Sequence, residues 1–255
     1  MTPAADSAKA QHISEAEGSL PPLWFLAPEG FFALPLAATP EERSERARSF
    51  VRELYSRGDD SIWEPAAPYY AAIAERMGDT GVSYAAMGLF STVDAGEESD
   101  APDGHIIRHE PAHGVAQCAF TVAIAPTDQA GSDTDVVAQG ILATLSSDPY
   151  NDAIWLDLPC GPAVSCVTVR EYSLNAQASA SAAETKLLTG QVQVYVPFPT
   201  GPYTAIFTLY TASMDHWAEL YRLLSSILQT VSFVDPAEDA VAVPVKGHAK
   251  GVRAT

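Results

Sequence analysis

Short apolar segments joined by tight turns constrain the second half of this chain more than any other feature. Residues 186–197 and 203–211 are rich in β-branched and aromatic side chains, and only five residues of turn composition, 198–202, separate them. A connection this short joins antiparallel strands, because parallel strands need a crossover of a dozen residues or more. Residues 153–158 and 163–172 flank a second short turn. The pattern therefore predicts a mostly antiparallel β-sheet.

Amphipathic segments placed among these strands predict helices. The clearest begins at Pro40, because Thr39 is a favourable N-cap and Glu42 stands at the capping-box position. We expect this helix to end at Gly58. The fold class expected is α+β, with helices packed on the sheet. Further helices are expected at residues 65–77 and 135–145 and after Ser213, and further strands at residues 23–26, 31–36, 82–92 and 115–125.

The domain organisation expected is a single α+β unit over residues 20–234. Residues 1–19 are polar and rich in alanine, so a flexible leader is expected there. Residues 235–255 are polar and are expected to be a disordered tail. Neither an internal repeat nor a linker rich in Pro or Gly divides the unit.

Charge and cysteine content restrict the partners and the compartment. The chain has 32 Asp and Glu against 14 Lys and Arg, which gives a formal net charge of −18. Such a chain repels phosphate backbones and anionic lipid, so neither nucleic acid nor a membrane is an expected partner. An odd, low count of three cysteines is typical of a reducing compartment. Without a recognisable signal peptide, a cytoplasmic location is expected.

The second half also resembles a known family. The run Leu156-Asp157-Leu158-Pro159-Cys160-Gly161-Pro162-Ala163-Val164 is similar to the LPAGPAV turn of actinobacterial proteins with the Mog1/PsbP-like α/β/α sandwich, among them the LpqN-type lipoproteins. Residues 195–209 and 214–233 resemble the closing hairpin, helix and last strand of that family, and the resemblance covers mainly residues 153–234. It implies the sandwich fold and a role as a binding or assembly accessory. The lipidation cysteine of those lipoproteins is absent, so their secreted role is not implied.

Three histidines form the strongest metal-like pattern. His105, His109 and His113 are spaced four apart, and on a helix that spacing would align three imidazoles for zinc. Pro111 and Gly114 interrupt the segment, however, which favours a solvated loop without a metal. The three histidines are therefore kept as candidate ligands only, and no cofactor is expected.

Nucleophilic catalysis has equally little support in the sequence. Cys160 and Cys166 flank a turn, but Arg170 is the only cation nearby in sequence that could stabilise a thiolate. Small buried apolar side chains are the simpler interpretation of both cysteines. A nucleophile elbow, a phosphate-binding glycine loop and a G-x-G-x-x-G fingerprint are all missing from the sequence. No catalytic residue is therefore predicted.

Four aromatic residues near the N-terminus are the candidate interaction site. Trp24, Phe25, Phe31 and Phe32 cluster in a segment interrupted by prolines. One interpretation is that they cover the sheet or pack on the first helix. The other is an exposed patch for another protein or for a second subunit. A homodimer could also form through a sheet edge.

Three functions remain open at this point. The expected one is a non-enzymatic protein-interaction or assembly accessory. The second is a small-molecule binding module, with an apolar pocket lined by aromatic residues. The third is an enzyme or metal-binding protein that uses the histidine segment. The aromatic residues expected to line the pocket of the second function are Tyr195, Phe198, Tyr203, Phe207, Tyr210 and Trp217.

Overall fold

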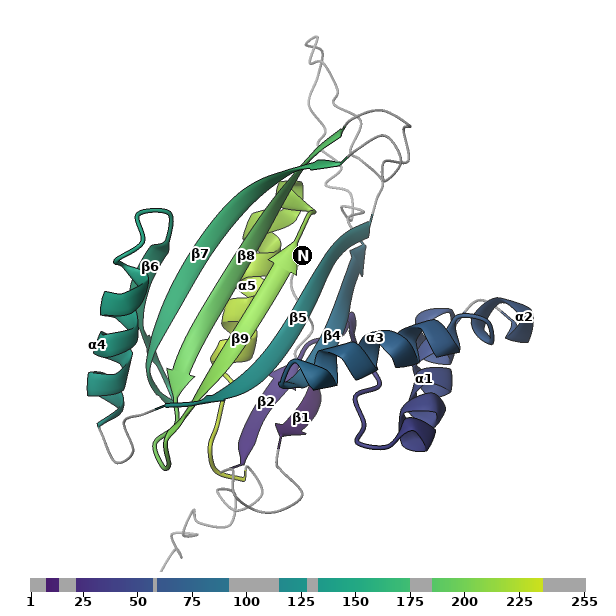
Figure 1. Ribbon diagram of the computed structural model, residues 1–255, viewed down its shortest axis with the longest axis horizontal. Coiled ribbons are helices and arrows are strands. Elements are labelled where there is room, and N and C mark those ends of the chain that lie inside the picture. Colours follow the sequence, from purple (N-terminus) through teal and green to yellow (C-terminus); the bar gives the residue numbers. More distant parts are fainter. Residues whose placement is uncertain are drawn as a thin grey trace, which may run out of the picture.

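The computed structural model describes residues 8–13, 22–56, 59–91, 115–127, 133–174 and 185–235. Within these ranges, seven strands form one antiparallel sheet in the order β3-β4-β5-β9-β8-β7-β6 (Figure 1). The predicted α+β class with a mostly antiparallel sheet is confirmed. The strands are β1 (Lys9–Ile13), β2 (Leu23–Ala27), β3 (Phe31–Ala33), β4 (Val82–Ser91), β5 (Val115–Pro126), β6 (Asp152–Leu158), β7 (Gly161–Leu174), β8 (Thr185–Pro197) and β9 (Tyr203–Thr211). The helices are α1 (Pro40–Leu54), α2 (Asp60–Trp63), α3 (Ala67–Asp79), α4 (Thr134–Leu145) and α5 (Trp217–Leu228), the last preceded by a 3-10 turn at Met214–His216.

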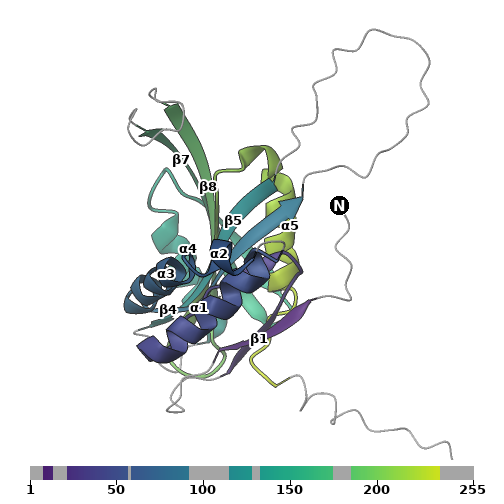
Figure 2. The same ribbon diagram turned by 90° about the vertical axis from the view of Figure 1, so that its right-hand side faces the viewer.

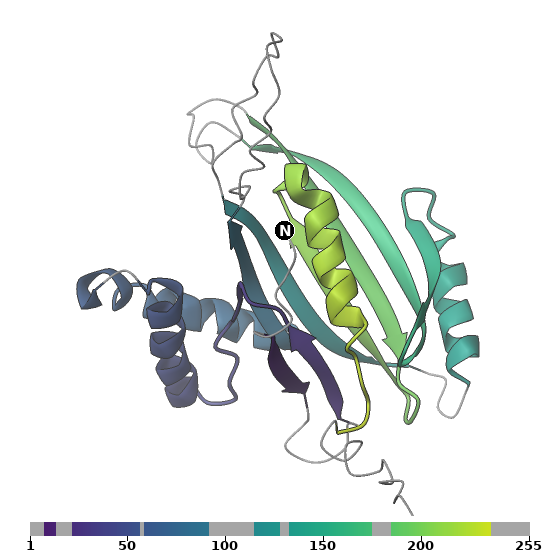
Figure 3. The ribbon, with the colours of Figure 1, turned by 180° about the vertical axis from the view of Figure 1, so that it is seen from behind.

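One face of the sheet packs against α5 and the β1–β2 hairpin (Figure 3). Phe25 of β2 lies edge-on to Tyr84, Phe120 and Phe207, which belong to β4, β5 and β9. Aromatic pairs in this arrangement are stabilising beyond the area they bury. The hairpin thus covers the β4–β5 side, while the buried Leu220, Leu224 and Ile227 turn the apolar face of α5 towards the core.

The opposite face carries α1, α3 and α4 (Figure 2). Phe32 of β3 and Met87 of β4 are register partners on this face, and both pack against the apolar cluster of α1 and α3. Phe50 and Val51 are the buried centre of that cluster. The N-terminal helices therefore pack on the same sheet that contains the C-terminal strands.

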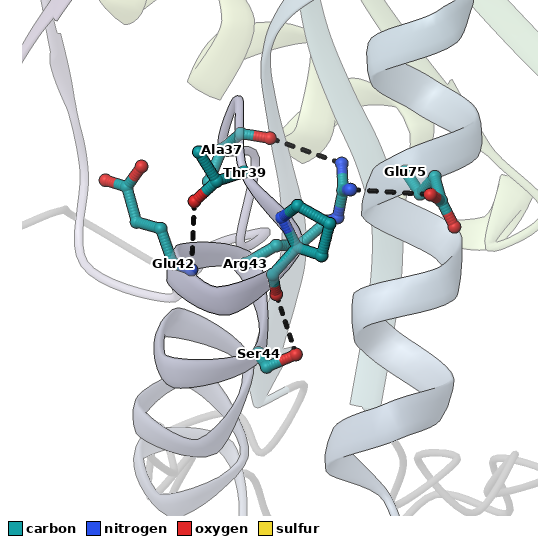
Figure 4. A network of polar contacts seen from close by, with 7 residues as sticks. Ala37, Thr39, Glu42, Arg43, Ser44 and Glu75 are labelled. Atoms are coloured by element: carbon teal, nitrogen blue, oxygen red, sulfur yellow. Dashed lines mark hydrogen bonds and ion pairs between the residues drawn. The ribbon is translucent and has the colours of Figure 1, made fainter.

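A polar network fixes the start of α1 and joins it to α3 (Figure 4). The Thr39 hydroxyl accepts a hydrogen bond from the Glu42 N–H at 3.3 Å, as predicted for an N-cap. The Glu42 carboxylate pairs instead with Arg46 one turn along the helix. Arg43, whose side chain is 13% exposed, donates to the Ala37 carbonyl at 3.2 Å and contacts the Glu75 carboxylate at 3.4 Å.

The structure differs from the sequence expectations at several element ends. Part of the expected flexible leader is strand β1, of which only Ile13 is buried. Main-chain pairing with β2 and stacking of His12 on Trp24 at 3.9 Å hold this strand, and neither leaves a hydrophobic pattern in the sequence. The helix α1 ends at Leu54 and not at Gly58.

The expected final helix also begins later than predicted. Ser213 makes no capping bond and its hydroxyl accepts from the Gln117 N–H instead, so a 3-10 turn precedes α5. The short last strand expected after α5 is a single bridge between Trp24 and Ser232. The expected tail lies beyond the described residues, except for Asp235.

Gly190 of β8 generates the first prediction. A Cβ at this position would meet the ring of Trp217 and, at 3.0 Å, the sulfur of Met214. We expect Gly190→Ala to lower the free energy of unfolding by about 1–3 kcal/mol, because the ring must shift. Gly78→Ala is the matched control, since a Cβ there meets nothing within 4 Å and alanine favours the helix. Urea titration measures both, and equal stability of the two variants would contradict this packing.

Candidate functional site

The face that carries α5 is incompletely covered. Seven strands about 4.8 Å apart span roughly 29 Å, whereas a helix with its side chains is about 10 Å wide. The β1–β2 hairpin lies over β4 and β5, and α5 packs over the centre and contacts only part of β6 and β7, so within the described residues the outer part of these two strands is uncovered (Figure 3). On this face Ala163 and Ser165 of β7 are buried under α5, whereas Ile154 and Val169, farther from the helix, are strongly exposed.

The apolar side chains on this part of the face, together with Leu188 of β8 and Tyr221 of α5, form a surface that we call the α5-side shelf. Strand register places them on one face, because Ile154 pairs with Ser165, Leu156 with Ala163 and Val169 with Gly190. Three of them are strongly exposed: Ile154 at 45%, Val169 at 52% and Leu188 at 45%. Large apolar side chains grouped on a surface mark interaction sites, whereas single ones do not. The shelf is formed by Ile154, Leu156, Leu158, Val167, Val169, Leu188 and Tyr221.

A cavity of about 130 Å³ opens between the shelf and α5. Its walls are mainly aliphatic, with Asp157, Ser225 and Gln229 as polar members. Small-molecule sites usually have about 300–1,000 Å³, so this cavity suits a single apolar side chain better than a cofactor. Such sockets commonly receive the anchoring residue of a protein partner. The lining consists of Leu156, Asp157, Leu158, Val192, Val194, Tyr221, Leu224, Ser225, Leu228 and Gln229.

Acidic residues border the shelf. Between residues 115 and 169 the described part of the chain contains no Lys or Arg. Lys186 does reach the far end, where its ammonium pairs with Glu171 of β7 at 2.7 Å. The Asp157 carboxylate accepts a hydrogen bond from the Trp155 indole at 2.9 Å. On the shelf face itself, register places the carboxylates of Asp152 and Glu171, whereas Asp157 belongs to the other face of β6.

The centre of the opposite sheet face is lined by small and polar side chains, unlike the shelf. Along β5 the exposed residues alternate with buried ones, and those facing this side include Gln117, Ala119 and Thr121. Their register neighbours Thr208 and Tyr210 of β9 are also polar. Small and polar side chains are ordinary for a sheet face open to water. This face therefore needs no partner to cover it, in contrast to the shelf.

The predicted metal ligands are not part of the described structure. His105, His109 and His113 lie between β4 and β5 outside the described residues. Among the residues that are described, no group of three or more His, Cys, Asp or Glu could hold a metal ion.

The three cysteines lack the surroundings of a catalytic thiol. All are free, Cys118 and Cys166 are buried and Cys160 is half-buried. Burial raises the pKa of the Cys118 thiol to about 12, and it also raises the pKa values of Cys160 and Cys166. Because the thiolate is the nucleophile, these environments oppose covalent catalysis.

The four aromatic candidates do not form one exposed patch. Phe25 and Phe31 are buried in the core, at 1% and 6% exposure. Phe32 packs on the opposite face against the α1 cluster. Trp24 is half-buried, and its indole N–H has no hydrogen-bond partner in the described part of the chain.

The aromatic residues expected to line a ligand pocket are also separated. Phe207 and Phe198 are core residues on the α5 side, whereas register places Tyr195 and Tyr210 on the opposite face. None of the six lines the cavity beside the shelf. A hollow of about 310 Å³ lies elsewhere, between α1 and α3, and Arg48 and Glu64 are its charged lining residues.

Comparison with known proteins adds no assignment: no protein-family model and no curated protein matches this chain. Within the described residues, every helix is too short or too polar to cross a membrane.

The thiol environments give the second prediction. An unfolded cysteine has a pKa near 8.5, so at pH 8 the Cys118 thiolate should be far scarcer in the folded chain. We expect alkylation of Cys118 at pH 8 to be at least about a hundredfold slower in the folded chain than in urea. The free energy of unfolding should also fall as the pH rises above about 8.5, because the unfolded thiol loses its proton first. Peptide mass spectrometry after timed alkylation measures the rates, and rapid labelling of native Cys118 would contradict its burial.

Proposed function

We propose that this protein is a non-enzymatic interaction or assembly accessory, whose partner is another protein bound on the α5-side shelf. The observation that carries the proposal is that Ile154, Val169 and Leu188, each at least 45% exposed, lie on the sheet face that also holds the apolar cavity. Leaving such side chains in water is unfavourable by about 25 cal/mol per Å² of apolar area. A bound protein surface would remove that area from water.

The chemistry of the site favours a protein over a small molecule. The cavity beside the shelf is below the usual size of a ligand site, and its apolar surroundings extend along two strands. An extended apolar area with a central socket is the usual anatomy of a protein interface. The resemblance to Mog1/PsbP-like proteins supports the same role, since it implies accessory functions. A cytoplasmic location belongs to this proposal and rests on the cysteine content.

The third prediction tests the proposal by capture. The tagged chain is purified from its native cells, and the co-purifying protein is quantified by mass spectrometry. We expect one protein in stoichiometric amount, and we expect the double variant Val169→Lys/Leu188→Lys to retain at least about tenfold less of it, because two desolvated apolar side chains become charged. Both positions are already exposed, so stability should change by less than about 1 kcal/mol.

Tyr69→Lys is the matched control. Tyr69 is 68% exposed on α3, across the sheet from the shelf, and its variant should keep the partner. Loss of the partner from the Tyr69 variant alone would place the interface elsewhere. If the wild-type chain is recovered without any partner under mild crosslinking, the proposed interaction function is contradicted.

A further inference from the structure

The outer strand of the shelf, β6, is an unpaired sheet edge in the described part of the chain. It ends the strand order, and no described strand pairs with its outer side. Natural sheets protect their edges with charged side chains, above all Lys, with Pro, bulges or very short strands, or with a covering helix or loop. The opposite edge follows this rule, because β3 has only three residues and Pro35 follows it closely. By contrast, β6 has seven residues without Lys or Pro, and its pairing with β7 shows no bulge.

The main chain of β6 offers a regular row of hydrogen-bonding groups. Leu158 and Gly161 close the two-residue turn to β7, and residues that close such a turn bond to each other. Alternation then directs the N–H and C=O groups of Ala153, Trp155 and Asp157 away from β7. Pro162, the register partner of Asp157, has no N–H to donate, which agrees with this assignment.

We propose that β6 accepts an added strand from the partner protein, an extended segment with apolar residues at its centre and Lys or Arg at both ends. This inference rests on the proposed function and specifies how the partner binds. The added strand would place apolar side chains opposite Ile154 and Leu156, and so continue the shelf and reach the cavity. Addition of a strand to an exposed edge is a recurrent mode of peptide recognition.

Charge complementarity selects this occupant over a second copy of the chain. Asp152 and Asp157 are the only charged residues of β6, five positions apart and on opposite faces. A cation at each matching position of the added strand would neutralise them. Self-pairing of β6 would offer neither carboxylate a cation, because β6 contains no Lys or Arg.

The probe that tests the proposal is a labelled peptide with the central sequence Lys-Val-Tyr-Val-Thr-Lys, flanked by Gly and Ser. Its binding to the full chain is measured by fluorescence anisotropy. The companion peptide carries Glu in place of both Lys residues. We expect the acidic peptide to bind at least about tenfold more weakly, because its two carboxylates would face Asp152 and Asp157 and repel them. Asp152→Lys/Asp157→Lys should reverse the preference between the two peptides, and Asp79→Lys on α3 is the control that should not.

Ala153→Pro distinguishes strand addition from side-chain contact alone. Proline there removes an outward N–H and leaves the ladder to β7 intact, so a retained melting temperature is expected together with at least about tenfold weaker peptide binding. If Ala153→Pro binds normally while Val169→Lys/Leu188→Lys does not, the shelf binds side chains only, and strand addition is overturned although the proposed function stands. Strand addition would also be overturned if the peptide did not bind, or if the charge-reversed variant kept the preference of the wild type. It would equally be overturned if sedimentation showed a dimer of the chain that Ala153→Pro dissociates.

Discussion

The position of α5 across the sheet determines the rest of this structure. At its start, the Trp217 ring lies over Gly190, where no Cβ intervenes. After its end, the chain bridges to β2 through Trp24 and Ser232, and the Thr230 hydroxyl accepts a hydrogen bond from the Leu26 N–H at 2.9 Å. These contacts hold α5 over the central strands, with the β1–β2 hairpin beside it. A single helix of 12 residues fixed there covers only part of β6 and β7 and leaves Ile154 and Val169 exposed.

This arrangement explains why the two open parts of the sheet differ. The centre of one face is bordered by α3 and α4 and is lined by small and polar side chains, which water can solvate (Figure 1). The edge of the other face is lined by Ile154, Val169 and Leu188, which water solvates poorly. The same edge ends in a strand that has neither Lys, Pro nor a bulge and whose only charges are two carboxylates. Apolar side chains and free main-chain groups thus occur together at one place, as an interface for an extended protein segment requires.

Local signals in the sequence predicted much of the fold. The turns around residues 159–160 and 198–202 predicted two hairpins, and both are present. Thr39 predicted the start of α1 because capping depends only on neighbouring residues. β1 was missed because its stability comes from main-chain pairing with β2 and from one ring contact, with little apolar burial of its own.

The candidate site was much harder to predict than the fold. Phe25 and Phe31 are as apolar as any interface residue, and only the sheet order shows that they are internal. Conversely, the run Ile154-Trp155-Leu156 has the pattern of a strand buried on both faces, and only its place at the end of the sheet makes it an edge. The resemblance to Mog1/PsbP-like proteins stays a prediction, since the comparisons with known proteins do not test it.

Amide hydrogen exchange tests the central claim, that the shelf and its edge strand form a protein interface, most directly. The chain bound to the protein captured with it is compared with the chain alone, peptide by peptide. The account predicts slower exchange in the complex for β6 and for the parts of β7 and β8 around Val169 and Leu188, with α1 and α3 unchanged. Protection confined to α1 and α3, with β6 exchanging equally in both samples, would contradict it.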